Sequence, residues 1–353
     1  MRKTLACFAA LPILLASACN APASDDGAAQ GAASETSASD AAADAETAAV
    51  APNPLFTGAD PDSMTIDGEL WIFPTGSATG SWSADRFHAY SSSDLETWTD
   101  RGTLICMDDI DWIDEDGAEF HALWAPGIAE KDGKYYLYYS VGPQNPTPSR
   151  IGVAVADRPE GPYTDSGAPL ITGGDGFEAI DAMVFTDEPS GKTYLYAGGS
   201  AGATLRVWEL GPDMISLARE VDVETPKNFT EGAFMSERDG TYYLSYSHGR
   251  FNRGNYSVHY ATAPSPTGPW TYAGPILTSD QTHQGPGHHS FAEDPQTGEP
   301  VIVYHRWDVP AGTEEPFEGE RNVAIERLVY RDDGSIAPVV MTDGEGSEVV
   351  EAE

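Results

Sequence analysis

Three carboxylic residues that lie far apart in the chain, Asp60, Asp181 and Glu231, occupy corresponding places in repeated stretches of sequence. His288 occupies the same place in a further copy. Burying one unpaired carboxylate is costly, so three that point to one place require a function. Carboxylates that cannot all ionise together are typical of a site that transfers protons.

The stretch around Glu231 shows the local structure that would position such a residue. Residues 229–249 read FTEGAFMSERDGTYYLSYSHG, with Asp239-Gly240 between two β-prone runs. An Asp-Gly pair in this setting predicts a tight β-hairpin, because the turn requires positive φ. Glu231 is therefore expected near the beginning of the first hairpin strand.

The chain contains five copies of this pattern. Their turn glycines are Gly68, Gly133, Gly191, Gly240 and Gly298, at intervals of 65, 58, 49 and 58 residues. A second strand pair follows each copy, so the sequence predicts an all-β, five-bladed β-propeller with four-stranded antiparallel blades. Counting back from the turn glycines, Asp60, Ala125, Asp181, Glu231 and His288 take equivalent places and should converge on the propeller axis.

The first residues of the chain resemble an export signal. Residues 1–18 carry Arg2 and Lys3 followed by an apolar run, and LLASAC resembles a bacterial lipobox with Cys19 as its lipidated residue. Residues 19–52 are predicted to form a disordered, acidic, Ala/Ser-rich tether. The propeller is expected over residues 53–342, followed by an acidic tail over residues 343–353. The protein is thus expected to be exported and lipid-anchored to the bacterial cell envelope, or secreted if Cys19 is not lipidated.

The charge of the chain limits its partners. Removal of Arg2 and Lys3 with the signal would leave 17 basic residues against 56 acidic ones, a net charge near −39. Such a surface does not bind nucleic acid electrostatically and disfavours sulfated or uronic-acid-rich polymers. A neutral oligosaccharide or polysaccharide fits this charge.

Several motifs together resemble glycoside hydrolase family 43, over about residues 53–342. They include NPLFTGADPD around Asp60, SSDLETW, WAP, IDAMVF, TEGAF, GPGHHS, YHR and RNVAIERL. The resemblance implies that Asp60 is the general base, that Glu231 is the general acid, and that Asp181 orients the acid and raises its pKa. It also implies that Arg321 contacts the substrate.

Two further residues have open roles at this stage. The resemblance implies that His288, near the axis, helps to bind substrate or holds a structural calcium ion or its water shell, and no organic cofactor is expected. His289 is the alternative to His288 for the axial position. Trp124 either forms the floor of the sugar site or packs between blades.

The implied chemistry requires this set of carboxylates. Inverting hydrolysis uses one protonated carboxyl to donate to the leaving oxygen and one ionised carboxylate to activate water on the opposite face. The two groups stand roughly 6.5–9.5 Å apart. A third carboxylate beside the acid keeps the acid protonated near neutral pH.

The predicted function is that of an exo-acting, inverting glycosidase that releases terminal α-L-arabinofuranose and/or β-D-xylose, and the protein is expected to be a monomer. The alternatives are an endo-arabinanase, another glycosidase of the same propeller clan, and a non-catalytic surface glycan-binding propeller. The retaining fructan hydrolases are disfavoured because Ala59, Ile180 and Gly232 stand where those enzymes carry Asn, Arg and Cys.

Overall fold

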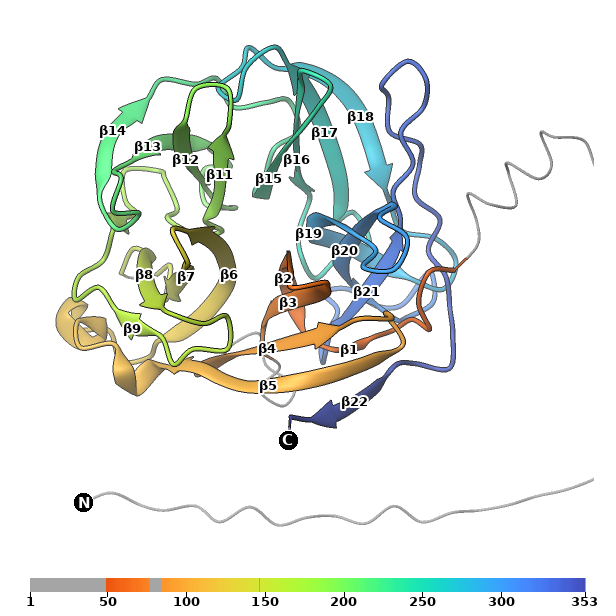
Figure 1. Ribbon diagram of the computed structural model, residues 1–353, viewed down its shortest axis with the longest axis horizontal. Helices are drawn as coiled ribbons and strands as arrows, with labels where there is room; N and C mark the ends of the chain where they lie inside the picture. Colours follow the sequence, from red (N-terminus) through yellow and green to blue (C-terminus); the bar gives the residue numbers. More distant parts are fainter. Residues whose placement is uncertain (1–48, 77–83, 146, 353) are drawn as a thin grey trace, which may run out of the picture. The chain divides into compact units, whose positions relative to one another are not determined.

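A computed structural model describes residues 49–76, 84–145 and 147–352 of the chain (Figure 1). The predicted signal, the lipidation site at Cys19 and nearly all of the predicted tether lie outside these residues. Five separate sheets stand around a common axis, with almost no helix, so the prediction of an all-β, five-bladed propeller is confirmed. The described residues include no helix that is long and apolar enough to span a membrane.

The first three blades contain the following strands. Blade one has β2 (Ala59–Ile66), β3 (Glu69–Thr75), β4 (Arg86–Ser92), β5 (Thr97–Cys106) and β22 (Glu348–Glu351). Blade two has β6 (Ala122–Lys131), β7 (Lys134–Gly142) and β8 (Arg150–Ala156), with β9 (Thr164–Asp165) and β10 (Ile171–Thr172) both paired to β8. Blade three has β11 (Met183–Asp187), β12 (Lys192–Ala197), β13 (Arg206–Leu210) and β14 (Leu217–Val221).

The last two blades complete the ring. Blade four has β15 (Glu231–Arg238), β16 (Thr241–His248), β17 (Ser257–Ala263) and β18 (Thr271–Leu277). Blade five has β19 (Gln284–Glu293), β20 (Pro300–Trp307), β21 (Asn322–Arg327) and β1 (Phe56–Thr57). Two short 3₁₀ helices, η1 (Met107–Asp109) and η2 (Ile113–Asp116), lie between blades one and two.

The predicted hairpin turns have the backbone conformation that their sequence requires. Asp239 has φ 51° and Gly240 has φ 79°, and they join β15 to β16 as expected. Asp67-Gly68 and Asp132-Gly133 also combine two positive φ values. Aspartate and glycine tolerate this region better than other residues, which is why the same pair recurs in three blades.

Both ends of the described chain add strands that the repeat pattern did not indicate. β1 pairs with β21 through Phe56 and Val323, so a strand from before the first repeat completes blade five. β22, in the segment expected to be an acidic tail, pairs in parallel with β5. Pairing between the first and last parts of a ring closes it and covers sheet edges.

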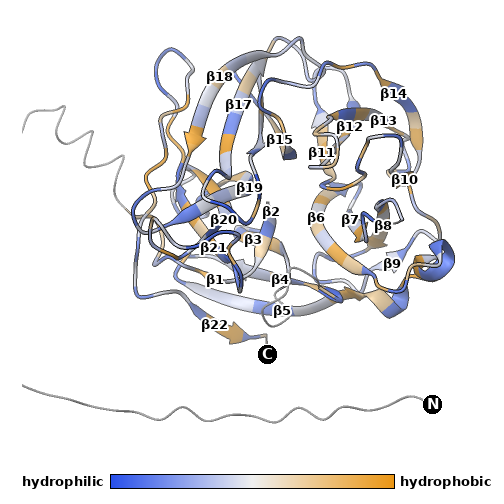
Figure 2. Cartoon of the chain, turned by 180° about the vertical axis from the view of Figure 1, so that it is seen from behind, coloured by the Kyte–Doolittle hydropathy of each residue, from blue (hydrophilic) through white to orange (hydrophobic). Residues whose placement is uncertain are grey.

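The core lies between neighbouring blades. Five clusters of buried apolar residues each join two adjacent blades, as Leu137 of β7 packs with Phe87 of β4 and Leu123 of β6. Most of the tyrosines of the YYLYYS motif are buried in these clusters, in agreement with their predicted packing role. Individual strands carry both hydrophobic and hydrophilic segments (Figure 2).

Candidate active site

An equivalent residue with positive φ occurs within the first strand of each blade or, in blade three, two residues before it. These residues are Asp60 (47°), Ala125 (44°), Asp181 (60°), Gly232 (60°) and His288 (40°). In blades one, two, four and five the strand register shifts at this point, as in a β-bulge. A bulge bends the strand and redirects its side chains, which is common beside active sites. The equivalent residue of blade four is therefore Gly232, and the alignment of Glu231 with this position was wrong by one residue.

Hydrogen bonds between blades hold these positive-φ residues in place. The donors and acceptors are Ala125 N–H to Thr75 Oγ1 (2.7 Å), Asp181 N–H to Ser140 Oγ (2.9 Å), His288 N–H to Ser247 Oγ (2.8 Å) and Asp60 N–H to His305 Nδ1 (3.1 Å). Each acceptor belongs to the second strand of the preceding blade. In blade four the Gly232 N–H instead donates to Asp181 Oδ2 (3.0 Å). The residues around the axis thus support one another across blade boundaries.

A cavity of about 440 Å³ brings the predicted site residues together. Its walls are Asp60, Trp124, Pro143, Gln144, Asn145, Ile180, Asp181, Ser200, Glu231, Phe251, His288 and Arg321. All six residues that were predicted to form the site are among them. A cavity of this size is typical of small-molecule binding sites.

Asp60 is held as an ionised carboxylate by its neighbours. Arg321 Nη1 donates to Oδ1 (3.0 Å) and Thr75 Oγ1 donates to Oδ2 (2.8 Å). Burial alone would raise the pKa of Asp60, but the Arg321 guanidinium and the imidazoles of His288 and His305 hold this pKa well below its usual range. An ionised carboxylate with fixed orientation is suited to accept a proton from water.

Glu231 has the opposite environment. It is buried, and its Oε1 accepts a hydrogen bond from the hydroxyl of Tyr256 (2.7 Å). Burial raises its pKa to about 7; the Tyr256 hydrogen bond lowers it, while the charges of Glu178 and Asp60 raise it further. Glu231 can therefore hold a proton near neutral pH, as a general acid must.

Asp181 and His288 line the same cavity as Asp60 and Glu231. His288 Nδ1 is 3.5 Å from Asp60 Oδ1 and 3.5 Å from Asp181 Oδ2, so the two carboxylate oxygens are at most 7.0 Å apart. Burial, followed by the charges of Glu231 and Asp60, raises the pKa of Asp181 well above its usual range. Burial also lowers the pKa of His288, which favours the neutral imidazole.

The structure places His288, and not its neighbour, at the cavity. His289 is 3% exposed, its Nε2 lies 2.6 Å from Ser245 Oγ, and its ring packs against Phe234 and Phe291. Burial lowers its pKa to about 3, so it is a neutral core residue. The preference for His288 as the axial residue agrees with this arrangement.

Trp124 and Arg321 both line the cavity. A Cβ on Gly142 would lie only 2.0 Å from Trp124 Cη2, so the glycine allows the indole ring to pack directly on β7 while the residue also lines the cavity. Trp124 therefore packs within its own blade and lines the cavity, as a residue at the floor of a sugar site would. The guanidinium of Arg321 lies 5.2 Å from the ring centroid of Phe251 and binds Asp60.

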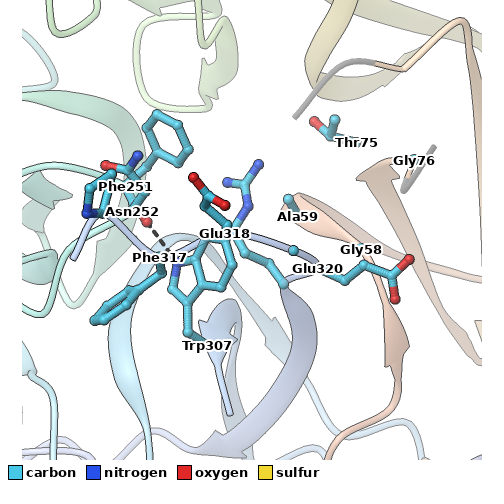
Figure 3. A pocket seen from close by; sticks show the side chains of 13 residues that line it. Gly58, Ala59, Thr75, Gly76, Phe251, Asn252, Trp307, Phe317, Glu318 and Glu320 are labelled. Atoms are coloured by element: carbon cyan, nitrogen blue, oxygen red, sulfur yellow. Dashed lines mark hydrogen bonds between the residues drawn. The ribbon is translucent and has the colours of Figure 1, made fainter. Parts of the chain in front are cut away.

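A second cavity of about 340 Å³ adjoins the first and shares Phe251 and Arg321 with it (Figure 3). Trp307 Nε1 donates to the carbonyl of Phe251 (2.8 Å), which fixes this part of the common wall. Neither Asp181 nor Glu231 lines the second cavity. It therefore lies beside the carboxylate site and does not contain it.

Sequence reasoning missed one buried acid near the cavity, Glu178. Its side chain lies beneath Gly199, where an added Cβ would be 3.1 Å from Glu178 Cδ. Its charge acts on both Asp181 and Glu231. The only sequence signal was its place three residues before Asp181, because it has no counterpart in the other repeats.

The surroundings of His288 do not form a protein cage for calcium. Calcium prefers six to eight oxygen ligands, whereas the two carboxylates near His288 already accept hydrogen bonds from Arg321, Thr75 and the Gly232 N–H. Within the described ranges, one metal-compatible group was found: His283, Asp308 and Asp343. Arg306 contacts both aspartates, at 2.8 and 3.4 Å, so this group is already an ion-pair network.

The chain is similar to a known protein family. The family model for "Glycosyl hydrolases family 43" matches residues 51–336. The chain belongs to glycosyl hydrolase family 43. It is therefore a glycoside hydrolase with a five-bladed propeller fold.

Relatives within family 43 carry several activities in their names. A β-D-galactofuranosidase of Aspergillus niger is 38% identical over 308 residues, covering 82% of this chain and 85% of that protein. Xylosidase/arabinosidase 43A of Humicola insolens is 29% identical over 346 residues, covering 80% and 98%. Among solved structures, a β-xylosidase/α-arabinofuranosidase from a compost metagenome, in a calcium-free form with xylotriose, matches with a TM-score of 0.65 and 27% identity, covering 83% of this chain and 98% of that one.

Proposed function

We propose that this family 43 hydrolase is an exo-acting, inverting glycosidase that releases terminal α-L-arabinofuranose or β-D-xylose. In this proposal Asp60 activates the water, Glu231 protonates the leaving oxygen and Asp181 modulates the acid. The observation that supports it is the opposite shift of two pKa values in one cavity, with Asp60 lowered and Glu231 raised to about 7. Carboxyl groups whose environments separate their pKa values are suited to the base and acid roles.

The residues around Asp60 and Glu231 support their assignment as base and acid. Arg321 holds the base through Oδ1 and adjoins the space for substrate. Asp181 and Glu231 share a buried region in which both carboxyls cannot be ionised at once, so a proton is retained on the acid side. No step of this reaction is assigned to a metal ion. Calcium near His288, with ligands largely from water, remains a prediction from the family resemblance.

A second substrate class, β-D-galactofuranosides, is favoured by the relative from A. niger. β-D-Galactofuranose has the same ring configuration as α-L-arabinofuranose and differs in a longer exocyclic arm. The same carboxylate arrangement can therefore serve either sugar if the cavity accommodates that arm.

A side-by-side assay of aryl α-L-arabinofuranoside, β-D-xyloside and β-D-galactofuranoside tests the substrate assignment. Turnover of either pentoside is expected. Turnover of the galactofuranoside alone would select the second class, and turnover of none would leave a glycan-binding role. Proton NMR of the first product should show the inverted anomer; a retained anomer would contradict the mechanism.

The cellular location is a separate proposal. We infer export and lipid attachment at Cys19 from the lipobox-like LLASAC sequence. The full chain should then fractionate with membranes in a bacterial host, and the Cys19→Ser variant should not.

The hydrolase is expected to act as a monomer, which light scattering of the mature chain would check.

A further inference from the structure

Glu178 is a fourth acidic residue beside the catalytic cavity, in the segment that leads to Asp181. Its side chain is buried, with only 3% of the residue exposed. Its Oε2 accepts hydrogen bonds from the Ala201 N–H (2.5 Å) and from Ser200 Oγ (3.4 Å). Both donors lie in the loop between β12 and β13, and Ser200 itself lines the cavity.

The loop and the Asp181 segment are packed closely around this carboxylate. Gly198 N–H donates to the carbonyl of Ile180 (3.0 Å). A Cβ on Gly199 would lie 2.4 Å from Ile180 Cδ1, so the glycine lets the Ile180 side chain pack directly against the loop. Glu178 Oε1 is buried and has no hydrogen-bond partner among the described residues. The carboxylate therefore joins two parts of the cavity wall. Burial raises the pKa of Glu178 itself, and the hydrogen bonds from the Ala201 N–H and Ser200 lower it.

We propose that Glu178 is a positioning residue for the glycosidase reaction. Through Oε2 it holds the 199–201 loop at the cavity wall, and its buried side chain places a fourth acid in the segment that leads to Asp181. This inference rests on the proposed role of Glu231 as the general acid. It assigns part of the role of keeping Glu231 protonated to a residue outside the three predicted carboxylates.

The other charged and titratable groups around Glu231 come from four more elements. Asp60 of β2 raises the pKa of Glu231, whereas Arg321, which precedes β21, and the hydroxyl of Tyr256, which precedes β17, lower it. The charge of Glu231 raises the pKa of Asp181, and burial lowers the pKa of His288, which favours its neutral form. Of the negative charges that raise the pKa of Glu231, that of Glu178 has the largest effect. Only burial and the Tyr256 hydrogen bond change this pKa more.

Glu178→Gln tests the charge while preserving the size of the side chain and an oxygen that can accept from the Ala201 N–H. Loss of a negative charge lowers the pKa of Glu231, so Glu231 loses its proton at a lower pH. The basic limb of the kcat/KM profile should therefore move about 0.5–1 pH unit lower. KM at the optimum should stay within about twofold of the original enzyme, because the loop remains attached.

Two further substitutions separate charge from packing. Glu178→Ala removes the charge and the loop contact, so the basic limb should move in the same direction and KM should rise. Glu178→Asp retains the charge and should keep the original limb. Glu326→Gln is the matched control, because Glu326 is another buried carboxyl, bonded to the Thr342 N–H (2.7 Å) in blade five and not lining the cavity. This control should leave the profile unchanged.

An unchanged basic limb in both Glu178→Gln and Glu178→Ala, with folding verified by circular dichroism, would overturn the proposed role of the charge. An unchanged KM in Glu178→Ala would overturn the loop-positioning role. Failure of the underlying assignment is distinguishable, because Glu231→Ala would then retain full activity on an unactivated oligosaccharide whatever the Glu178 variants do.

Discussion

The two sides of the catalytic cavity give the same functional group opposite properties. On the side formed by blades one and five, Asp60 meets Arg321, Thr75 and two imidazoles, which hold its pKa well below the usual range. On the side formed by blades three and four, Glu231 meets Tyr256 and is surrounded by the acids Asp181 and Glu178, and burial raises its pKa to about 7. A carboxyl group becomes a base or an acid according to its neighbours.

Removal of the Asp60 carboxylate should cause the largest loss of activity. Asp60→Ala leaves no carboxylate to activate water, so kcat/KM should fall about 10²–10⁴-fold. The fall should be similar for an activated aryl glycoside and for an oligosaccharide, because both require the water. Steady-state kinetics on the two substrates measure it, and Asp157→Ala, on the exposed surface, is the control. Near-normal activity of Asp60→Ala would exclude Asp60 as the base.

The loss of activity on removal of the acid, Glu231, should depend on the leaving group. Glu231→Ala should slow an oligosaccharide about 10²–10⁴-fold and an aryl glycoside with an acidic leaving group much less, since that group needs little protonation. Measuring kcat/KM against leaving-group pKa for a series of aryl glycosides should give a steeper dependence in the variant. Equal losses for all leaving groups would contradict the acid role of Glu231.

Asp181→Asn should make Glu231 lose its proton more readily while preserving the geometry around it. The asparagine oxygen can still accept the hydrogen bond from the Gly232 N–H, so KM should change little. The charge of Glu231 raises the pKa of Asp181, and repulsion between two carboxylates is mutual. Its loss in the variant should therefore lower the pKa of Glu231 and move the basic limb of the pH profile to lower pH. A pH profile of kcat/KM checks the direction. A movement to higher pH would show that Asp181 is not a like-charge neighbour of the acid.

Arg321→Gln should move both limbs of the pH profile in the same direction. Arg321 lowers the pKa of Asp60 and also that of Glu231, so both values should rise in its absence. The base then ionises at higher pH and the acid keeps its proton to higher pH, which moves the whole profile upward. KM should rise as well because Arg321 lines the cavity. A fixed acidic limb would mean that His288 and His305 are sufficient to hold Asp60 ionised.

Calcium removal should have the smallest effect, and on stability more than on chemistry. If a hydrated ion is held at His288, chelation should lower the melting temperature by a few degrees, and added calcium should restore it. The same treatment should not affect His288→Ala. Unchanged melting of the original protein, together with metal-free elemental analysis, would remove calcium from the description of this site.

Much of the fold and part of the site could be predicted from the sequence because they repeat. Five turn glycines at regular intervals indicate the number of blades, and Asp60, Asp181 and His288 recur at the same backbone position, each with positive φ. Local rules of this kind depend on residues that are close in the chain. The Asp-Gly turns and the buried tyrosine-rich strands follow from them as well.

Only the tertiary structure decided how the acid side is built. Glu231 lies one residue before its repeat position, which Gly232 occupies, because a bulge changes the direction of side chains within a single residue. Glu178 has no counterpart in the repeats and acts through space. The proton affinities of Asp60 and Glu231 depend on burial and on charges from other blades, and sequence spacing contains neither quantity.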